Sequence, residues 1–576
     1  MKPKLGDMDL GSISPEGTGL SPKRGAPDNL TAANRRWPRT VSALLLALPT
    51  GTNRLTRRAA TAQCTMATQP EIKLKSETFH PICESAEGGE LPRFKTFLAG
   101  SWYAGDDWSD VRSPIDLSVV AQVPVLSEKT ASGAFAQVFQ EGRSAVREMP
   151  GTKRLDVYHR AADLMEECTD DFAAVLTVNA GKTGAGALGE VKAAVERLRK
   201  SDFDTRKLIG DYIPGDWSGE TVETEGLVRR EPIGVVLAIN PFNYPLFDAV
   251  NKLVYSTIAG NAIMIKPASS TPLASLLLAR VLEVAGFPKR ALAVLTMRGS
   301  QLAKIASDER VAGITLTGST QSGREILKLA GIKRYVLELG GGDPAIVLDD
   351  ADLPASAQKI VGGMTSFAGQ RCDAIKHVFV EQKVYDEVKR LVVGELGRIR
   401  VGDPRESETT MGPLLDLDAA ATMREATRDA VAKGALILTG GGDFETNYVQ
   451  PTLLEVSGEA LVGTELYRGE VFAPIATITP FSDLKQAIEL ANGRRYGLDA
   501  AVFGRDMNRI RRLIRTLEVG AIYINDQPRH GIGYYPYGGR KDSGIGESGI
   551  GYTINYVTAP KSIVYNYKGK NVWEYL

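Results

Sequence analysis

The fold is decided by the stretch VVLAINPFNYP at residues 235–245 and by the segments that follow it. Short apolar strands alternate there with helical segments, whose apolar residues recur every three or four positions. Strands are expected at 235–239, 262–265, 292–295 and 313–316, with helices at 251–259 and 272–285. This alternation is typical of β-α-β units, which form a parallel sheet covered by helices on both faces. A second series, with strands at 345–348, 379–380 and 475–479, predicts a second α/β domain.

The second series surrounds a thiol, Cys372, in the stretch FAGQRCD at residues 367–373. A thiol is a useful nucleophile as its thiolate, and a neighbouring cation such as Arg371 favours that form. An isolated cysteine is more often a small buried hydrophobic residue. A catalytic role for Cys372 therefore needs support from other residues.

Three polar side chains near the ends of apolar runs supply that support. Glu338 lies in an apolar run that ends in three glycines, where an ionised carboxylate is costly unless it has a partner or a chemical task. Asn243 follows the strand at 235–239, and Lys266 ends the next strand. The presence of Glu338, Asn243 and Lys266 in the same chain makes Cys372 a candidate nucleophile.

Further motifs occur in a fixed order: TGS at 317–319, EVFAP at 470–474 and PYGGRKDSG at 536–544. With the residues above, they make the chain similar to the aldehyde dehydrogenase superfamily from about Phe94 to the C-terminus. The resemblance implies an α/β, aldehyde-dehydrogenase-like fold, with a Rossmann-like cofactor domain, an α/β catalytic domain and an oligomerisation arm. The wording GQRCDAIK at 369–376 most resembles the non-phosphorylating glyceraldehyde-3-phosphate dehydrogenases, particularly those of archaeal type.

The resemblance implies catalytic roles for three residues. Cys372 would attack an aldehyde carbon, and the amide of Asn243 with the backbone N–H of Cys372 would bind the oxyanion, where one donor is worth about 3 kcal/mol. Glu338 would be the general base that activates water to hydrolyse the thioester, since an apolar setting raises a carboxyl pKa towards neutrality. The alternatives are a turn residue for Asn243 and a buried salt bridge for Glu338.

The resemblance also implies a nicotinamide cofactor. Lys266 and Glu470 match residues that contact the ribose hydroxyls, and Phe472 matches a ring that packs near the nicotinamide ribose. Gly318 and Ser319 open a helix whose N-terminal N–H groups can face phosphate. Taken alone, Gly318 and Ser319 would be ordinary helix capping, and Phe472 would be a core residue.

The choice between NADP and NAD depends on Ser269. NAD-specific relatives often carry a glutamate at this position, and its charge repels a 2′-phosphate. Because that charge is absent here, the predicted cofactor is NADP or NAD. The chain departs from most relatives at Gly342, where they carry lysine, which affects local contacts only.

A phosphorylated aldehyde is the predicted substrate. Arg371, Tyr244 and Arg529 match positions that relatives use to hold a substrate phosphate, and Arg206 is a further candidate. The expected reaction is the irreversible oxidation of D-glyceraldehyde 3-phosphate to 3-phosphoglycerate. Alternatives are a succinate semialdehyde or lactaldehyde dehydrogenase, a coenzyme-A-acylating enzyme, which would generally lack the equivalent of Glu338, and a non-catalytic structural relative.

Composition excludes several other classes. The 576 residues carry 69 basic and 69 acidic side chains, so the chain has no net charge that would attract nucleic acid or an anionic membrane. Four cysteines and four histidines show no metal-type spacing, which predicts no metal site and a reducing compartment. The longest apolar run near the start, 41–48, is far shorter than the roughly 20 residues that a membrane span needs.

The chain divides into segments of different character. Residues 1–93 are predicted to be a leader, disordered or targeting. For the first 65 residues three interpretations stay open: disorder or a true start at Met66, a transit peptide, and a secretory signal. The protein is accordingly expected in the cytoplasm, or in a plastid or mitochondrion if the leader is a transit peptide.

The remaining segments follow the resemblance. An early strand is expected at 97–102. The cofactor-binding domain is predicted at 94–210 and 229–338, and the catalytic domain at 339–537. Residues 211–228 and 552–576 are predicted oligomerisation elements, which imply a homodimer or homotetramer.

Overall fold

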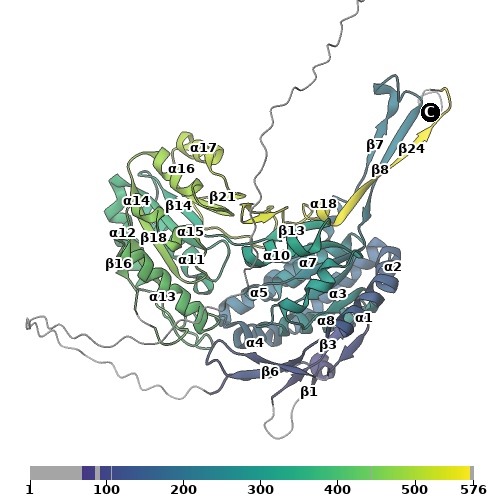
Figure 1. Cartoon of the computed structure of the whole chain (residues 1–576), viewed down its shortest axis with the longest axis horizontal. Helices are drawn as coiled ribbons and strands as arrows, with labels where there is room; N and C mark the ends of the chain where they lie inside the picture. Colours follow the sequence, from purple (N-terminus) through teal and green to yellow (C-terminus); the bar gives the residue numbers. More distant parts are fainter. Residues whose placement is uncertain (1–67, 85–90, 106, 443, 571–576) are drawn as a thin grey trace, which may run out of the picture. The chain divides into compact units, whose positions relative to one another are not determined.

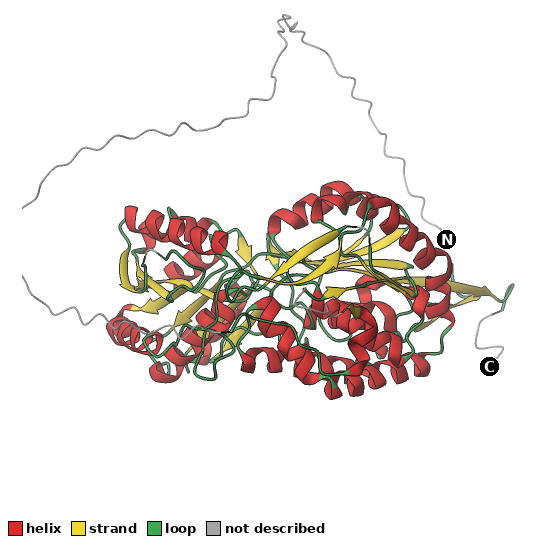
Figure 2. Cartoon of the chain, turned by 90° about the horizontal axis from the view of Figure 1, so that it is seen from below, coloured by secondary structure: helices red, strands yellow, loops and turns green. Residues whose placement is uncertain are grey.

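The computed structural model describes residues 68–84, 91–105, 107–442 and 444–570. Within these residues two large sheets are each flanked by helices on both faces, and a smaller three-stranded sheet stands apart from them (Figures 1 and 2). The predicted α/β fold is confirmed. The predicted leader through residue 67 lies outside the described residues.

The first large sheet has eight strands in the order β23-β13-β12-β9-β10-β11-β3-β4. Its central strands are parallel, whereas β3, β4 and β23 pair antiparallel at the edges. The strands are β3 (Thr96–Leu98), β4 (Ser101–Tyr103), β9 (Val235–Ile239), β10 (Ala262–Lys266), β11 (Leu292–Val294), β12 (Val311–Thr317), β13 (Arg334–Glu338) and β23 (Gly544–Ile545).

Helices cover both faces of this sheet because its central strands are apolar on both sides. Helix α8 is buried along most of its length and ends at Gly286, whose φ of +87° suits a residue without a side chain. The helices of this part are α1 (Glu128–Gln137), α2 (Arg143–Glu148), α3 (Gly151–Glu167), α4 (Thr169–Ala180), α5 (Gly184–Arg199), α6 (Asp202–Thr205), α7 (Phe247–Ile258), α8 (Leu273–Ala285), α9 (Ala303–Ser307), α10 (Thr320–Ala330) and α18 (Ile554–Val557).

The second large sheet has seven strands in the order β16-β17-β18-β15-β14-β20-β21. All its pairings are parallel except that of the edge strand β16. The strands are β14 (Asp343–Val347), β15 (Ile375–Glu381), β16 (Leu436–Thr439), β17 (Thr452–Glu455), β18 (Ile475–Phe481), β20 (Asp499–Phe503) and β21 (Ala521–Ile524). The helices are α11 (Leu353–Thr365), α12 (Tyr385–Leu396), α13 (Leu417–Ala432), α14 (Gly458–Val462), α15 (Glu465–Arg468), α16 (Leu484–Asn492) and α17 (Met507–Thr516).

The three-stranded sheet has the order β24-β8-β7, from β7 (Asp211–Pro214), β8 (Thr224–Pro232) and β24 (Thr558–Asn566). It contains the hairpin and the late strand that were expected to serve oligomerisation. Several of its large apolar side chains are exposed, among them Ile213 at 52% and Val564 at 65%. Among the described residues, no helix is both long enough and apolar enough to cross a membrane.

The structure differs from the sequence prediction at the start of the folded part. Residues 68–84 were assigned to the leader, yet a short 3-10 helix at Glu77–Ile82 buries Phe79 and Ile82 completely. Phe79 meets Phe172 edge to face at 5.8 Å. Asp171 accepts hydrogen bonds from the backbone N–H groups of Lys75 and Ser76.

A small sheet continues this segment, with strands in the order β1-β2-β6-β5. The strands are β1 (Cys83–Glu84), β2 (Arg93–Phe94), β5 (Trp108–Arg112) and β6 (Val119–Pro124). The single strand expected at 97–102 is in fact a tight hairpin of β3 and β4, because Ala99 and Gly100 adopt positive φ angles of 47° and 104° and reverse the chain.

Phe79→Ala tests whether this early segment belongs to the core. Removing a fully buried phenylalanine leaves a cavity, so we expect the free energy of unfolding to fall by about 3–5 kcal/mol. The measurement is the midpoint of urea unfolding. His80→Ala is the matched control, since His80 is the exposed neighbour. Equal midpoints for both variants would show that the segment does not support the fold.

Candidate active site

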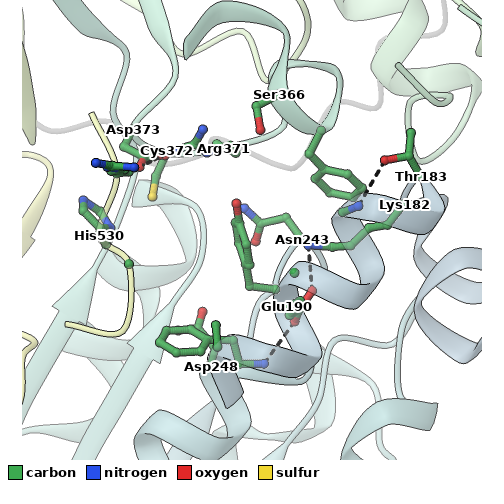
Figure 3. Close-up of a pocket in the computed structure, with 18 of the residues that line it drawn as sticks. Lys182, Thr183, Glu190, Asn243, Asp248, Ser366, Arg371, Cys372, Asp373 and His530 are labelled. Carbon is green, nitrogen blue, oxygen red and sulfur yellow. Dashed lines mark hydrogen bonds and ion pairs between the residues drawn. The ribbon is translucent and has the colours of Figure 1, made fainter. Parts of the chain in front are cut away.

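A cavity of about 730 Å³ brings together residues from strands β12 and β13 of the first sheet, from helices α5 and α7, and from the loop before β15 (Figure 3). Six of the predicted site residues line it: Asn243, Tyr244, Glu338, Arg371, Cys372 and Arg529. Arg206 does not line it; its guanidinium is exposed and stacks on the ring of Phe203 at 4.4 Å. The predicted cofactor residues also lie outside this cavity.

An unusual turn precedes Cys372. Phe367, Ala368 and Gly369 have φ angles of 50°, 52° and 66°, and a residue with a side chain pays roughly 1–2 kcal/mol to adopt this left-handed conformation. The side chain of Gln370 helps to hold the turn, because its Nε2 donates to the carbonyl oxygens of Phe367 (3.2 Å) and Pro413 (3.3 Å). Its Oε1 accepts from the backbone N–H of Leu415 at 2.8 Å.

The electrostatics of Cys372 differ from the sequence expectation. Burial raises the pKa of the Cys372 thiol well above its usual value, and Asp373 and Glu338 raise it further. Arg371 was expected to favour the thiolate, but its Nη2 donates to Asp373 Oδ2 at 2.6 Å, and both side chains are buried. The carboxylate neutralises the guanidinium, which therefore does little to lower the pKa of the thiol.

Asn243 lies where an oxyanion donor is needed. Its side chain is buried, and Nδ2 donates to the carbonyl oxygen of Gln370 at 2.9 Å. A primary amide carries two N–H donors. One holds the loop that carries Cys372, and the second has no acceptor among the described residues, so it is available to a substrate oxygen.

Glu338 ends β13 and is almost completely buried. Burial raises its pKa to about 8, although His530 and Lys252 act in the opposite direction. Its Oε1 has no hydrogen-bond partner among the described residues. A buried carboxyl with a free oxygen and a pKa near neutrality has the properties of a general base.

Lys266, which is predicted to bind the cofactor, is weakly bonded and lies beside a buried amide without partners. The Nζ of Lys266 has one long contact, 3.4 Å to Ser269 Oγ, and burial lowers its pKa to about 8. The neighbouring Asn240 is buried, and neither atom of its amide has a partner within the described part of the chain. Such unsatisfied donors and acceptors fit the ribose hydroxyls of a dinucleotide.

Glu470, Phe472 and Ser319 make contacts that do not require a cofactor. Glu470 Oε1 accepts from the backbone N–H of Gly341 at 3.0 Å, and the ring of Phe472 meets that of Phe242 at 5.8 Å. Ser319 caps α10 by accepting from the N–H of Ser322 at 3.1 Å. Beside it, Gly318 has only Leu316 within contact distance of the place where a side chain would start, which leaves the helix N-terminus open.

Two groups in the cavity were not found from the sequence. Lys182 and Glu190 form an ion pair of 2.6 Å with almost no exposure, and the Lys182 ammonium lies 3.9 Å from the centre of the Tyr244 ring. Glu190 also accepts from the N–H groups of Leu246 and Phe247, each at 3.0 Å, at the start of α7. No sequence motif marks the pair of Lys182 and Glu190, because the residues that it contacts, Tyr244 and the start of α7, come from a distant segment.

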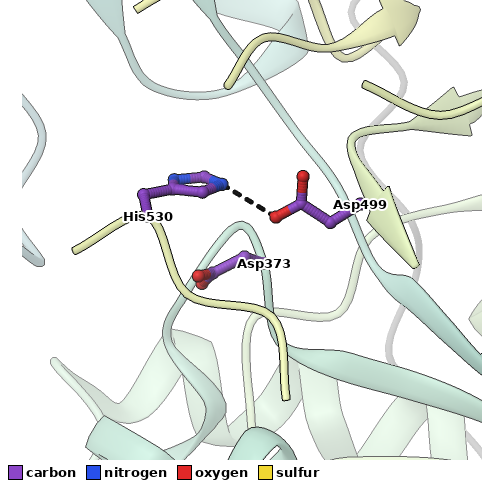
Figure 4. Close-up of side chains that lie close together, drawn as sticks. All are labelled: Asp373, Asp499 and His530. Carbon is purple, nitrogen blue, oxygen red and sulfur yellow. Dashed lines mark hydrogen bonds and ion pairs between the residues drawn. The ribbon is translucent and has the colours of Figure 1, made fainter. Parts of the chain in front are cut away.

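The second group is Asp373, Asp499 and His530, whose ligand-type atoms lie within 4.8 Å of one another (Figure 4). His530 Nε2 pairs with Asp499 Oδ2 at 2.9 Å, and its ring stacks on Tyr537 at 3.9 Å. Burial lowers the pKa of His530, but Asp499 and Asp373 outweigh it and raise that pKa to about 9. His530 is therefore a cation in the cavity wall at neutral pH.

Arg529 precedes His530 and differs from it. Its side chain is 64% exposed and pairs with Asp526 at 2.8 Å. It lines the mouth of the cavity, but water screens its charge.

Comparison with known proteins agrees with this geometry. Residues 102–563 match the aldehyde dehydrogenase family, and the chain belongs to that family. It is 32% identical over 476 residues to the NADP-dependent glyceraldehyde-3-phosphate dehydrogenase of Streptococcus equinus, covering 82% of this chain and 99% of the relative. It is 29% identical over 479 residues to the lactaldehyde dehydrogenase of Methanococcus aeolicus, covering 82% and 100%.

Solved structures give the same result. The NADP complex of the NADP-dependent glyceraldehyde-3-phosphate dehydrogenase from Bacillus halodurans is similar with a TM-score of 0.78 at 32% identity, covering 82% of this chain and 99% of that one. Aldehyde dehydrogenase 21 from Physcomitrella patens, in complex with succinate, has a TM-score of 0.79 at 30% identity, covering 83% and 98%. The chain is an oxidoreductase that uses NAD(P) as its cofactor.

Ser269→Glu tests the choice of cofactor. Two like charges about 4 Å apart repel by about 4 kcal/mol at an effective dielectric constant of about 20, before screening. If Ser269 faces the 2′-phosphate, the KM for NADP should rise much more than the KM for NAD. Steady-state kinetics with both cofactors measure this, and Ser270→Glu, at the neighbouring half-buried serine, is the matched control. Equal effects on the two cofactors would place Ser269 away from the 2′ position.

Proposed function

We propose that the protein oxidises D-glyceraldehyde 3-phosphate to 3-phosphoglycerate, irreversibly and without inorganic phosphate, with NADP or NAD as cofactor. The observation that carries the proposal is Arg371, which lines the cavity beside Cys372 and keeps a buried Nε without an acceptor among the described residues. An unsatisfied buried donor costs about 1–3 kcal/mol, which an anionic substrate group would recover. The glyceraldehyde-3-phosphate dehydrogenases among the relatives support the same choice.

Other groups would complete the anion site. Tyr244 and His530 line the same cavity, His530 as a buried cation, and Arg529 adds an exposed cation at the edge. A carboxylate could use the same groups. Succinate semialdehyde and lactaldehyde are therefore the alternative substrates.

In the proposed mechanism, Cys372 Sγ loses its proton to water in the cavity and bonds to the aldehyde carbon. The carbonyl oxygen becomes an oxyanion, which accepts hydrogen bonds from Asn243 Nδ2 and from the backbone N–H of Cys372. NAD(P), when bound, supplies the acceptor for the hydride that leaves this carbon. Lys266 and Glu470 would hold the ribose hydroxyls, and a thioester on Cys372 remains.

Glu338 then takes a proton from a water molecule, whose oxygen bonds to the thioester carbon as the C–S bond breaks. The products are the carboxylic acid and the free thiol. Burial of the cavity and its paired charges would keep other nucleophiles away from the thioester.

We also propose that the sheet of β24, β8 and β7 joins subunits into a homodimer or homotetramer. Its exposed apolar side chains and unpaired edges favour association.

Glu338→Gln should form one equivalent of reduced cofactor in a burst and then stall, because the thioester forms without a base to hydrolyse it. Below its pKa of about 8 the wild-type carboxyl is protonated and cannot accept a proton, so the hydrolysis rate should rise with pH and level off above about 8. Stopped-flow absorbance of the reduced cofactor measures both. Cys372→Ser, which should show no burst, is the control. If Glu338→Gln also shows no burst, Glu338 must act before hydride transfer.

Arg371→Lys tests the substrate. Lysine keeps a cation beside Asp373 but lacks the planar guanidinium and its Nε–H. We expect kcat/KM for glyceraldehyde 3-phosphate to fall by about tenfold, because a charged hydrogen bond contributes ~1.5 kcal/mol. The kcat/KM for unphosphorylated glyceraldehyde should change little. Arg529→Ala should cost only a few-fold, because ~0.2–1 kcal/mol is usual for an exposed ion pair.

The control is Arg206→Lys, an exposed arginine outside the cavity, which should leave the ratio of the two substrates unchanged. Each enzyme is assayed with both cofactors, with and without phosphate and coenzyme A. A wild-type preference for succinate semialdehyde or lactaldehyde would refute the glyceraldehyde-3-phosphate assignment and leave the aldehyde dehydrogenase assignment intact.

A further inference from the structure

Lys376 is a buried lysine that no step of the proposed mechanism uses. It lies in β15, shortly after Cys372, and is only 4% exposed. Its Nζ donates to two backbone carbonyl oxygens, that of Gly369 at 3.0 Å and that of Ala473 at 2.5 Å. These two acceptors belong to segments far apart in the sequence.

The surroundings of this amine are unusual for a charged group. Burial lowers the pKa of Lys376 to about 7, against the opposing effect of Glu470 and Asp343. Within the described part of the chain, no carboxylate lies within the 4.0 Å of an ion pair with it. A buried amine without a paired carboxylate is costly, so its contacts with the two carbonyls must compensate.

The two acceptors depend on Lys376 to different degrees. The carbonyl oxygen of Ala473 also accepts from the backbone N–H of Ile475 at 2.8 Å. The carbonyl oxygen of Gly369 has Lys376 as its only donor among the described residues. Gly369 is the last residue of the left-handed turn before Cys372, so Lys376 holds the end of that turn.

The turn and the segment around Ala473 are packed backbone against backbone. A side chain on Gly369 would begin 2.4 Å from the carbonyl oxygen of Ala473, which is closer than any real contact. Glu470 and Phe472 stand in the same short segment, just before Ala473. A displacement of the turn at residues 367–369 therefore displaces the segment around Ala473 as well, as long as Lys376 keeps its hydrogen bonds to both.

We propose that Lys376 is a positioning residue that ties the loop of Cys372 to the segment of residues 470–473, so that cofactor binding and the reactivity of the thiol are coupled through its ammonium group. The inference rests on the proposed cofactor role of Glu470 and Phe472. It does not depend on which aldehyde is the substrate.

The test measures the coupling directly in the full-length protein. Cys372 is alkylated with iodoacetamide with and without saturating NADP, and its modification is followed by mass spectrometry of the peptide that contains it. In the wild type we expect NADP to change the alkylation rate. We define the quotient as the alkylation rate with NADP divided by the rate without it. In Lys376→Met this quotient should approach one. The Kd for NADP should rise by about tenfold, as for the loss of one charged hydrogen bond.

Lys333→Met is the matched control. Lys333 also donates to two backbone carbonyls, those of Asp308 and Val311, each at 2.7 Å, but these belong neither to the loop of Cys372 nor to residues 470–473. It should keep the wild-type quotient, whereas a general loss of stability would affect both variants. Lys376→Gln, which keeps amide N–H donors on a shorter side chain, should give an intermediate quotient and serves if the methionine variant does not fold.

Two results would overturn the inference. One is a quotient in Lys376→Met equal to that of the wild type. The other is an alkylation rate in the wild type that does not change when NADP is added. Glu470→Gln separates the underlying assignment from the coupling. If that variant binds NADP as the wild type does, the proposed cofactor role of Glu470 fails, while the quotient in Lys376→Met still decides whether the two segments are coupled.

Discussion

The site depends on the left-handed turn at residues 367–369. Phe367 and Ala368 adopt strained positive φ angles, and two side chains that follow them in the sequence hold the turn: Gln370 binds the carbonyl oxygen of Phe367, and Lys376 binds that of Gly369. Asn243 binds the carbonyl of Gln370, so a candidate oxyanion donor also supports the loop that carries the thiol. The position of Cys372 thus follows from hydrogen bonds to distant parts of the chain.

Burial governs the electrostatics of the same region. Around Cys372 the cations are paired with carboxylates: Arg371 with Asp373, Lys182 with Glu190 and His530 with Asp499. Because these charges largely cancel, desolvation dominates and raises the pKa of both Cys372 and Glu338. A raised pKa lowers the thiolate character of Cys372, and thiolate character governs the oxidation of cysteine.

Much of the architecture could be predicted from local patterns. The alternation of apolar strands and helices indicated both parallel sheets, because a buried parallel strand must be apolar on both faces. Residues 68–84 were misassigned, since a short 3-10 helix with two buried side chains has no periodicity to detect. The hairpin of β3 and β4 was read as one strand because Ala99, a residue that rarely adopts positive φ, takes part in the turn.

The sequence by itself determined the α/β fold, the family and six of the residues that line the cavity, because strand periodicity and short motifs are local properties. Only the tertiary structure decided the charge state of those residues. It showed that Asp373 neutralises Arg371, that His530 is a buried cation while Arg529 is exposed, and that Arg206 lies outside the cavity. A pKa and a hydrogen bond depend on burial and on partners from distant segments, and the order of residues along the chain does not contain that information.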